Sequence, residues 1–322
     1  MDRPANSPII ERIQREAGIP GLVDALVERL NPTDLQSLLL EVYRRRATRV
    51  KPNHLLERYE QDRFVRPTTT EPARLTEFDR LSWSLLPDSY VPIELSPVCP
   101  LGTLSAIATV DQNKAVTTIR NTEVVADPTN VLALECASRR RRLLRADRLS
   151  AEPVRLATSQ RLVRGQAYRS PLARAHFRLF GLVTAGRDQG GFRFEVTSLV
   201  EHVGFYLRLL RELGRLGYVA DRVRVALTNL EPERERALDD GVLQPLRHAN
   251  PGVQCDFDPD RESGRGYYVG ACFKIYATNP AGTECELIDG GFTTWTRQLL
   301  SNAKERLLIS GLGVEVLFDR FA

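Results

Sequence analysis

Short strand-like runs separated by helical stretches constrain the fold of this 322-residue chain more than any other feature. The runs cover residues 90–95, 104–110, 179–184, 223–227, 267–276 and 284–288, and they are rich in β-branched, aromatic and other apolar residues. The clearest helix between them covers about residues 194–213, where Leu199, Val203, Tyr206 and Leu210 recur on one face. Strands and helices are mixed without regular alternation, so the pattern favours an α+β fold.

The first 74 residues are expected to form a separate helical region that ends in a linker. Leu22, Leu26 and Leu30 recur at one-turn spacing, and Asn31 and Pro32 then provide a cap and a first turn for a second helix. Residues 66–72 hold two prolines and no apolar period, which is typical of a connection. We therefore predict a helical N-terminal region with its linker over residues 1–74 and a core over residues 75–322.

Composition narrows the class of protein. With 45 Lys and Arg against 41 Asp and Glu, the formal net charge is +4, which is too mild to indicate a nucleic-acid-binding protein. No apolar run approaches the ~20 residues that cross a bilayer, and the start of the chain lacks the layout of a signal peptide. We expect a soluble protein of the cytoplasm that does not bind membranes.

Metal sites and disulfides are not expected. The five cysteines are scattered and never form a C-x-x-C pair, and the four histidines lie far apart in the sequence. The glycine and serine signatures of α/β-hydrolases, P-loop proteins and dinucleotide-binding proteins are also missing.

Residues 165–186 predict a strand, a loop and a returning strand. Arg169 on the first strand has the planar donor fork that grips phosphates, and Phe177 on the second offers a ring on which a base can stack. An edge hairpin with solvated arginines explains the same pattern, so the segment alone does not decide between the two.

The C-terminal segment favours the first of these alternatives. It holds Tyr267-Tyr268 at the start of a strand, then Asp289-Gly290-Gly291, then Gly311 to Glu315 before an apolar run. This order and spacing resemble histidyl-tRNA synthetase, in which a tyrosine-rich strand precedes a Gly-Gly turn and the third class II motif. The resemblance covers about residues 75–322 and implies a class II synthetase-like antiparallel sheet flanked by helices.

The resemblance also implies roles for individual residues. Arg169 would hold the α-phosphate of ATP and Phe177 would cover adenine, while Asp127 and Thr129 would hold the α-amino group of an amino acid. Tyr267, Tyr268 and Glu315 would line the ligand site. From the residues alone, the two tyrosines are equally well explained as core, and Asp127 and Thr129 as a turn that caps the next helix.

Departures from the family pattern are as informative as the matches. Val316 replaces the third-motif arginine, Ser263 replaces an arginine of the histidine pocket, and Leu179 and Val183 replace its glutamine and glutamate. A charged phosphate contact is therefore lost, and histidine is a poor candidate substrate. The chain also ends after the third motif, without the family's anticodon-binding domain, as in the ATP phosphoribosyltransferase regulatory subunit.

We therefore predict a paralogue outside translation that binds an amino acid or a nucleotide-like ligand as a regulatory or binding protein. The alternative is ATP-dependent activation of a carboxylate, with transfer to an acceptor other than tRNA. ATP and Mg²⁺ are the cofactors if the alternative holds, and otherwise none is expected. The resemblance implies a homodimer through residues 75–97, and the N-terminal helices offer a surface for a partner protein.

The basic run of residues 139–142 supports a third class of function. Clustered arginines bind phosphates or RNA because counterions are released on contact. Aromatic residues that would stack on bases are missing around the run. We favour a solvated helix face over an RNA-binding surface.

Overall fold

The computed structural model describes residues 8–166 and 174–321. The chain divides into two compact units: Met1–Arg63 with Thr117–Thr122 form the first, and Phe64–Val116 with Glu123–Ala322 form the second. The boundary predicted near residue 74 falls inside helix α5 (Pro72–Leu85) of the second unit, and it stays a prediction about independent folding.

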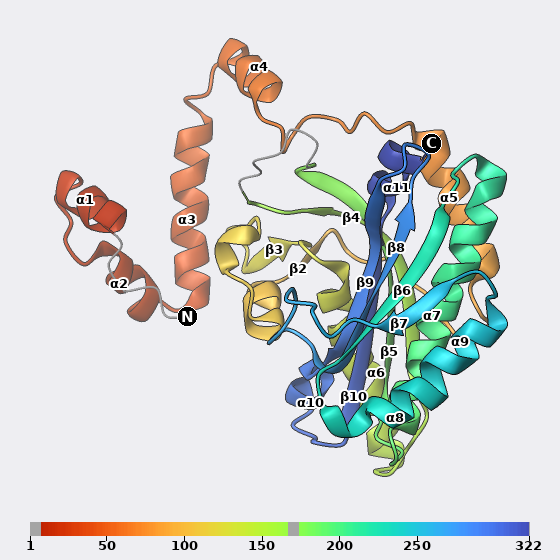
Figure 1. Ribbon diagram of the computed structural model, residues 1–322. Coiled ribbons are helices and arrows are strands. Elements are labelled where there is room, and N and C mark those ends of the chain that lie inside the picture. Colours follow the sequence, from red (N-terminus) through yellow and green to blue (C-terminus); the bar gives the residue numbers. More distant parts are fainter. Residues whose placement is uncertain (1–7, 167–173, 322) are drawn as a thin grey trace. The chain divides into compact units, whose positions relative to one another are not determined.

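The first unit is helical, as the apolar spacing predicts (Figure 1). Its helices are Pro8–Glu16 (α1), Leu22–Glu28 (α2), Pro32–Ala47 (α3) and Pro52–Gln61 (α4). Asn31 caps α3, because its side-chain oxygen accepts a hydrogen bond of 2.9 Å from the amide of Asp34. None of the residues described in these four helices is buried.

An eight-stranded sheet forms the centre of the second unit, in the order β1-β4-β5-β10-β9-β8-β6-β7. In that order the strands are Val91–Pro92, Val154–Val163, His176–Arg187, Glu305–Gly313, Glu284–Thr293, Val269–Thr278, Asp221–Asn229 and Gln254–Phe257. The six central strands pair antiparallel, and only the edge strands β1 and β7 pair in parallel with their neighbours. The α+β architecture predicted from the sequence is confirmed.

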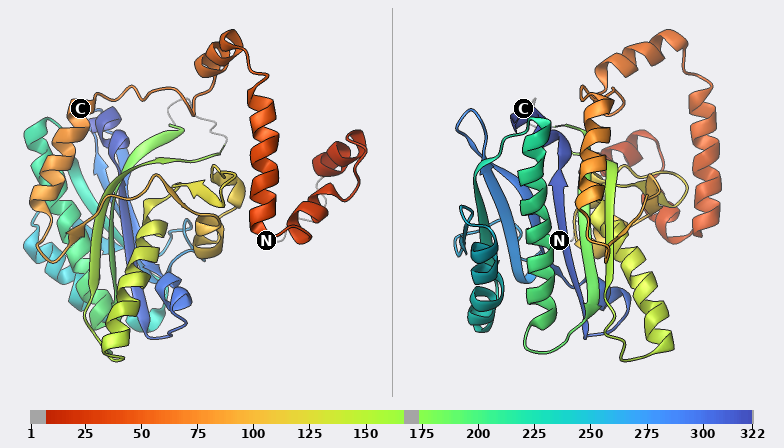
Figure 2. Two further views of the ribbon diagram at one scale, coloured as in Figure 1. Left: turned by 180° about the vertical axis from the view of Figure 1, so that it is seen from behind. Right: turned by 90° about the vertical axis from the view of Figure 1, so that its right-hand side faces the viewer.

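Helices cover both faces of this sheet (Figures 1 and 2). Helix α6 (Pro128–Ala146) packs on β4, β5 and β10, as does the short α10 (Trp295–Leu299) on β10. On the other face α7 (Arg193–Leu213), the helix predicted over 194–213, packs on β5 and β10 beside α5. The unit is completed by α8 (Glu235–Leu238), α9 (Gln244–Ala249) and α11 (Val314–Phe321).

Side chains alternate between the two faces along the central strands, which produces two hydrophobic cores. On β10, Leu308 and Leu312 join the core beneath α7, whereas Leu307 and Ile309 join the core beneath α6. This alternation is the ordinary period of a β-strand. No helix among residues 8–166 and 174–321 is long and apolar enough to cross a membrane.

The strands predicted at 179–184, 223–227 and 284–288 lie within β5, β6 and β9. The strand predicted at 90–95 is reduced to the two residues of β1, and that predicted at 267–276 begins only at Val269. The latter difference arises because Gly264 and Gly266 have φ of 83°, which turns the chain just before the strand.

The strand predicted at 104–110 is wrong, because a short π-helical turn, η1 (Thr103–Ile107), occupies this position. The buried carboxylate of Glu123 explains the difference. It accepts hydrogen bonds from the amides of Gly102 (2.9 Å) and Leu104 (2.8 Å) and from the side chain of Gln112 (2.6 Å). Backbone amides held by a carboxylate are not available to a strand partner. Glu123 lies on β3 (Thr122–Val124), which pairs with β2 (Val98–Pro100).

Candidate ligand-binding site

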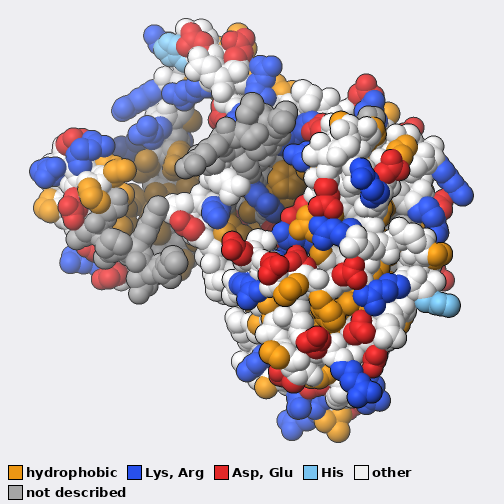
Figure 3. Space-filling model, in the orientation of Figure 1, with side chains coloured by type: hydrophobic (Ala, Val, Ile, Leu, Met, Phe, Trp, Pro, Cys, Tyr) orange, Lys and Arg blue, Asp and Glu red, His pale blue; other side chains and the backbone are white. Residues whose placement is uncertain are grey.

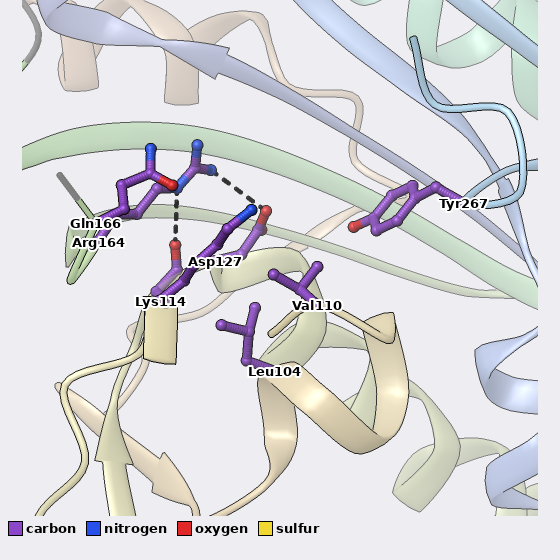
Figure 4. Close-up of a pocket in the computed structure, with 8 residues that line it drawn as sticks. Leu104, Val110, Lys114, Asp127, Arg164, Gln166 and Tyr267 are labelled. Carbon is purple, nitrogen blue, oxygen red and sulfur yellow. Dashed lines mark hydrogen bonds and ion pairs between the residues drawn. The ribbon is translucent and has the colours of Figure 1, made fainter. Parts of the chain in front are cut away.

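Two adjoining cavities of about 230 and 340 Å³ open in the second unit, on the face of the sheet that carries α6. They share Asp127, Arg164 and Tyr267 as lining residues. The smaller cavity is completed by Leu104, Val110, Lys114, Ala126 and Gln166 (Figure 4). The larger is completed by Thr129, Leu179, Gly264, Tyr268, Glu286, Asp289, Ile309, Ser310 and Gly311.

The Asp127-Pro128-Thr129 turn stands between the cavities and begins α6. Asp127 is the N-cap residue, and its Oδ1 accepts hydrogen bonds from the amide (2.9 Å) and hydroxyl (2.7 Å) of Thr129. The turn therefore does cap the helix, as one of the two interpretations of the sequence predicts. Both residues also line the larger cavity, so capping does not remove them from a ligand.

Arg164, which directly follows β4, faces this turn and was not singled out from the sequence. Its Nη2 lies 3.5 Å from Oδ2 of Asp127, and its Nε donates to the carbonyl of Ala126 at 3.2 Å (Figure 4). Its guanidinium lies 5.2 Å from the centroid of the Phe177 ring. One of 41 arginines on a strand end carries no local signal, so only the folded chain reveals this position.

Tyr267 and Tyr268 form the opposite wall. Their rings meet edge to face, with centroids 4.9 Å apart. Burial raises the pKa of both hydroxyls, and the carboxylates of Asp127 and Asp289 raise it further. Both tyrosines therefore remain protonated, and they act as core and as cavity wall at once.

Two ion pairs that the sequence did not predict lie beside the larger cavity. Nη2 of Arg261 lies 2.8 Å from Oδ1 of Asp289, and Nζ of Lys274 lies 2.7 Å from Oε2 of Glu286. Lys274 also donates to the hydroxyl of Ser263 at 2.8 Å. The only local signal is a lysine inside an otherwise apolar strand, because each partner is 12 or more residues away.

Glycine is required where β9 crosses this wall. A Cβ atom at Gly291 would lie 2.5 Å from Cβ of Cys272 and 2.6 Å from the ring of Tyr268. A Cβ atom at Gly290 would lie 2.6 Å from Cβ of Ser310. The Gly-Gly pair noted in the sequence thus allows Tyr268 to pack against the sheet.

The other predicted site residues do not line the two cavities directly. Phe177 is on β5 and Glu315 is in the first turn of α11, and neither is among the described residues that line these two cavities. Glu315 is buried, with Oε1 at 3.0 Å from Nη2 of Arg161 and Oε2 accepting from the amide of Arg178 at 2.7 Å. Arg169 lies outside the described residues.

The arginine run of residues 139–142 is not the fully solvated face that we favoured. Arg140 is completely buried and forms a two-pronged ion pair with Glu305, with N–O distances of 2.9 and 2.8 Å. It also donates to the carbonyls of Ser150 and Glu152. Arg139, Arg141 and Arg142 remain at least partly exposed, and Figure 3 shows acidic and basic side chains interspersed over the second unit. The run is partly structural.

The sheet and the helices on its two faces have the fold of the class II aminoacyl-tRNA synthetases. The fold is shared at 14% sequence identity with apo histidyl-tRNA synthetase of S. aureus (TM-score 0.56, covering 79% of this chain and 67% of that one). It is also shared, at 14% identity, with an ATP phosphoribosyltransferase regulatory subunit/histidyl-tRNA synthetase from Bacillus halodurans (TM-score 0.55, covering 80% and 82%).

A histidine–tRNA ligase subunit of Alicyclobacillus acidocaldarius shares the fold too, at 13% identity (TM-score 0.54, covering 78% of this chain and 95% of that one). The core is thus like that of the histidyl-tRNA synthetases and the regulatory subunit, as the sequence motifs predict. No family model matches the chain, and no curated protein matches it in sequence.

Proposed function

We propose that this protein binds a free amino acid in the larger cavity and acts as a regulatory or binding protein outside translation. The observation that carries the proposal is the group formed by Asp127, Thr129 and Arg164 at the edge of the cavity. An ammonium group needs oxygen acceptors, which Asp127 and Thr129 offer, and a carboxylate needs a donor fork, which Arg164 offers.

The geometry leaves room for such a ligand. The 3.5 Å separation of Arg164 from Asp127 is longer than the about 2.7–2.9 Å of a strong charged hydrogen bond, so both groups keep capacity for a zwitterion. The side chain of Arg164 is 35% exposed and that of Asp127 is 21% exposed. The cavity volume is also at the small end of the range for ligand pockets, which suits an amino acid better than a nucleotide.

The described residues do not fit ATP and Mg²⁺. The Phe177 ring is already in contact with the guanidinium of Arg164, and both oxygens of Glu315 have partners within the chain. Val316 brings no charge to the start of α11. Among the described residues that line the two cavities, only Lys114 and Arg164 are cationic, which is little charge for a triphosphate.

Two features support an action through other proteins. One of the proteins with the same fold is an ATP phosphoribosyltransferase regulatory subunit/histidyl-tRNA synthetase, and we propose a comparable regulatory role here. The helices of the first unit expose large apolar side chains, among them Ile9, Val27 and Leu55. We propose these helices as the surface for a partner protein and keep the homodimer as a second proposal.

Calorimetric titration with each of the 20 amino acids tests the proposal. We expect saturable binding of at least one amino acid. Its affinity should fall 10-fold or more in Asp127→Asn and in Arg164→Ala, and it should be unchanged in the surface control Arg224→Ala. Binding of no amino acid would overturn the proposal. Amino-acid-dependent exchange of pyrophosphate into ATP would instead establish the alternative, activation of a carboxylate, which depends on Arg169.

A further inference from the structure

We infer that the amino acid taken by this site carries a positive charge on its side chain, as lysine, ornithine and arginine do. The inference rests on the proposed function, because it assumes that the α-amino and α-carboxylate groups meet Asp127 and Arg164. It concerns the part of the larger cavity that Asp289 and Glu286 line.

The acidic side chains of this part of the cavity are more exposed than the basic side chains with which they pair. The side chains of Asp289 and Glu286 are 39% and 44% exposed, whereas those of their partners Arg261 and Lys274 are only 3% and 10% exposed. Asp289 and Glu286 line the cavity, and the two bases do not. A ligand therefore meets carboxylates in front of buried cations.

Each carboxylate keeps one oxygen for a ligand. Asp289 uses Oδ1 for Arg261, and Glu286 uses Oε2 for Lys274. The second oxygens, Oδ2 and Oε1, accept no hydrogen bond from a described residue, and the two side chains are 39% and 44% exposed. They therefore face solvent when the site holds no ligand, and a donor that enters the cavity must satisfy them.

The chemical class of the ligand follows from the free-energy cost of leaving these oxygens without hydrogen-bond partners. A neutral aliphatic side chain would strip water from two carboxylates without replacing its hydrogen bonds, and an acidic one would add repulsion. An ammonium or guanidinium group supplies both donors and charge. Leu179 and Ile309, which also line the larger cavity, offer apolar surface on which the methylene groups of such a side chain can lie.

The direction of the pKa shift of Asp289 agrees with this inference. Burial raises the pKa of the Asp289 carboxyl, and the nearby Arg261 opposes the rise. A ligand cation beside Asp289 would oppose it further and favour the ionised carboxylate.

Titration of the protein with matched ligands tests the inference. L-lysine, L-ornithine and L-arginine are compared with the neutral analogues L-norleucine and L-citrulline, and with cadaverine, which lacks the carboxylate. We expect at least one basic amino acid to bind 10-fold or more tightly than both neutral analogues and than cadaverine. The double variant Asp289→Asn, Glu286→Gln should lose this preference.

The control is Glu284→Gln, which lies on the same strand, carries a similarly exposed carboxylate paired with Arg224, and is outside the cavities. It should keep the preference. Equal binding of lysine and norleucine would overturn the inference and leave the proposed function intact, whereas binding of no amino acid would overturn both. Cadaverine binding as tightly as lysine would also overturn the inference, because the ligand would then be a diamine and not an amino acid. If the double variant does not fold, the comparison of ligands on the unmodified protein decides alone.

Discussion

At the scale of single residues, charged side chains of this protein have different roles according to their burial. Arg140 and Arg139 are neighbours in sequence, yet Arg140 is fully buried against Glu305 while the side chain of Arg139 is 30% exposed beside Glu135. A buried ion pair cannot lose one member without leaving the other unpaired in a medium that solvates charge poorly. A surface pair loses little, because water replaces the partner.

The substitution Arg140→Ala should therefore lower the free energy of unfolding by about 3–5 kcal/mol, because the carboxylate of Glu305 stays buried without a partner. The matched control Arg139→Ala should change it by less than about 0.5 kcal/mol. Urea unfolding followed by circular dichroism measures both. Similar effects of the two substitutions would show that the burial of Arg140 does not matter to stability.

A second residue-scale prediction concerns Gly291. The change Gly291→Ala places a methyl group within 2.6 Å of both Cys272 and Tyr268, so strands β8 and β9 must separate or the Tyr268 ring must move. We expect a loss of about 1–3 kcal/mol of unfolding free energy together with weaker ligand binding. The control is Gly282→Ala, where a Cβ meets no atom within 4 Å but φ is 80°, so some loss of stability without loss of binding is expected.

At the scale of elements, a buried hydrogen-bond network joins α7 to the central sheet. His202 on α7 lies 2.9 Å from Oγ1 of Thr184 through Nε2 and 2.7 Å from Oγ of Ser310 through Nδ1. Tyr90 and Tyr206 extend the network from its two ends. Burial lowers the pKa of His202 to about 3, and the charge of Arg155 adds to the effect.

This lowered pKa makes stability depend on pH. Between the folded value of about 3 and the usual value of about 6.5, the unfolded chain binds a proton at His202 that the folded chain does not. The contribution of His202 is therefore complete above pH 6.5 and is lost as the pH falls toward 3, by at most about 1.4 kcal/mol per pH unit.

His202→Gln tests this dependence, because glutamine keeps a donor and an acceptor but does not titrate. Chemical unfolding at pH 5.0, 6.0 and 7.0 should show a smaller slope of stability against pH in the variant than in the unmodified protein. Parallel slopes would mean that His202 does not titrate differently in the folded and unfolded chains.

At the scale of the whole molecule, the two compact units differ in how much they bury. The described residues of α1 to α4 include none that is buried, whereas α7 alone buries twelve. Local opening is easiest where few apolar contacts must break. The first unit should therefore be the less stable part of the protein when no partner is bound.

Hydrogen exchange measured by mass spectrometry tests this expectation. Amides of α1 to α4 should exchange at least 100-fold faster than those of β5, β9 and β10. Addition of a bound amino acid should slow exchange in the second unit only. Helices of the first unit that exchange as slowly as the central strands would indicate that another surface already covers them.

Local features of this fold could be predicted from sequence because short-range interactions produce them. The Asn31 cap, the helix at α7 and the Asp127-Pro128-Thr129 turn each depend on residues within one or two turns. Motif order also predicted the class II synthetase-like core. The strand predicted at 104–110 was wrong because Glu123, 19 residues beyond Leu104, holds the backbone in another conformation.

What the sequence by itself determined is the helical character of the first unit, helix α7, the strands β5, β6, β8 and β9, and one edge of the candidate site. Only the tertiary structure decided which charges face each other: Arg261 with Asp289, 28 residues apart, and Arg140 with Glu305, 165 residues apart. Periodicity reports which face of a strand or helix is apolar, but an ion pair forms wherever the sheet brings opposite charges together. The arrangement that places the carboxylates at the cavity and the bases behind them therefore exists only in the folded chain.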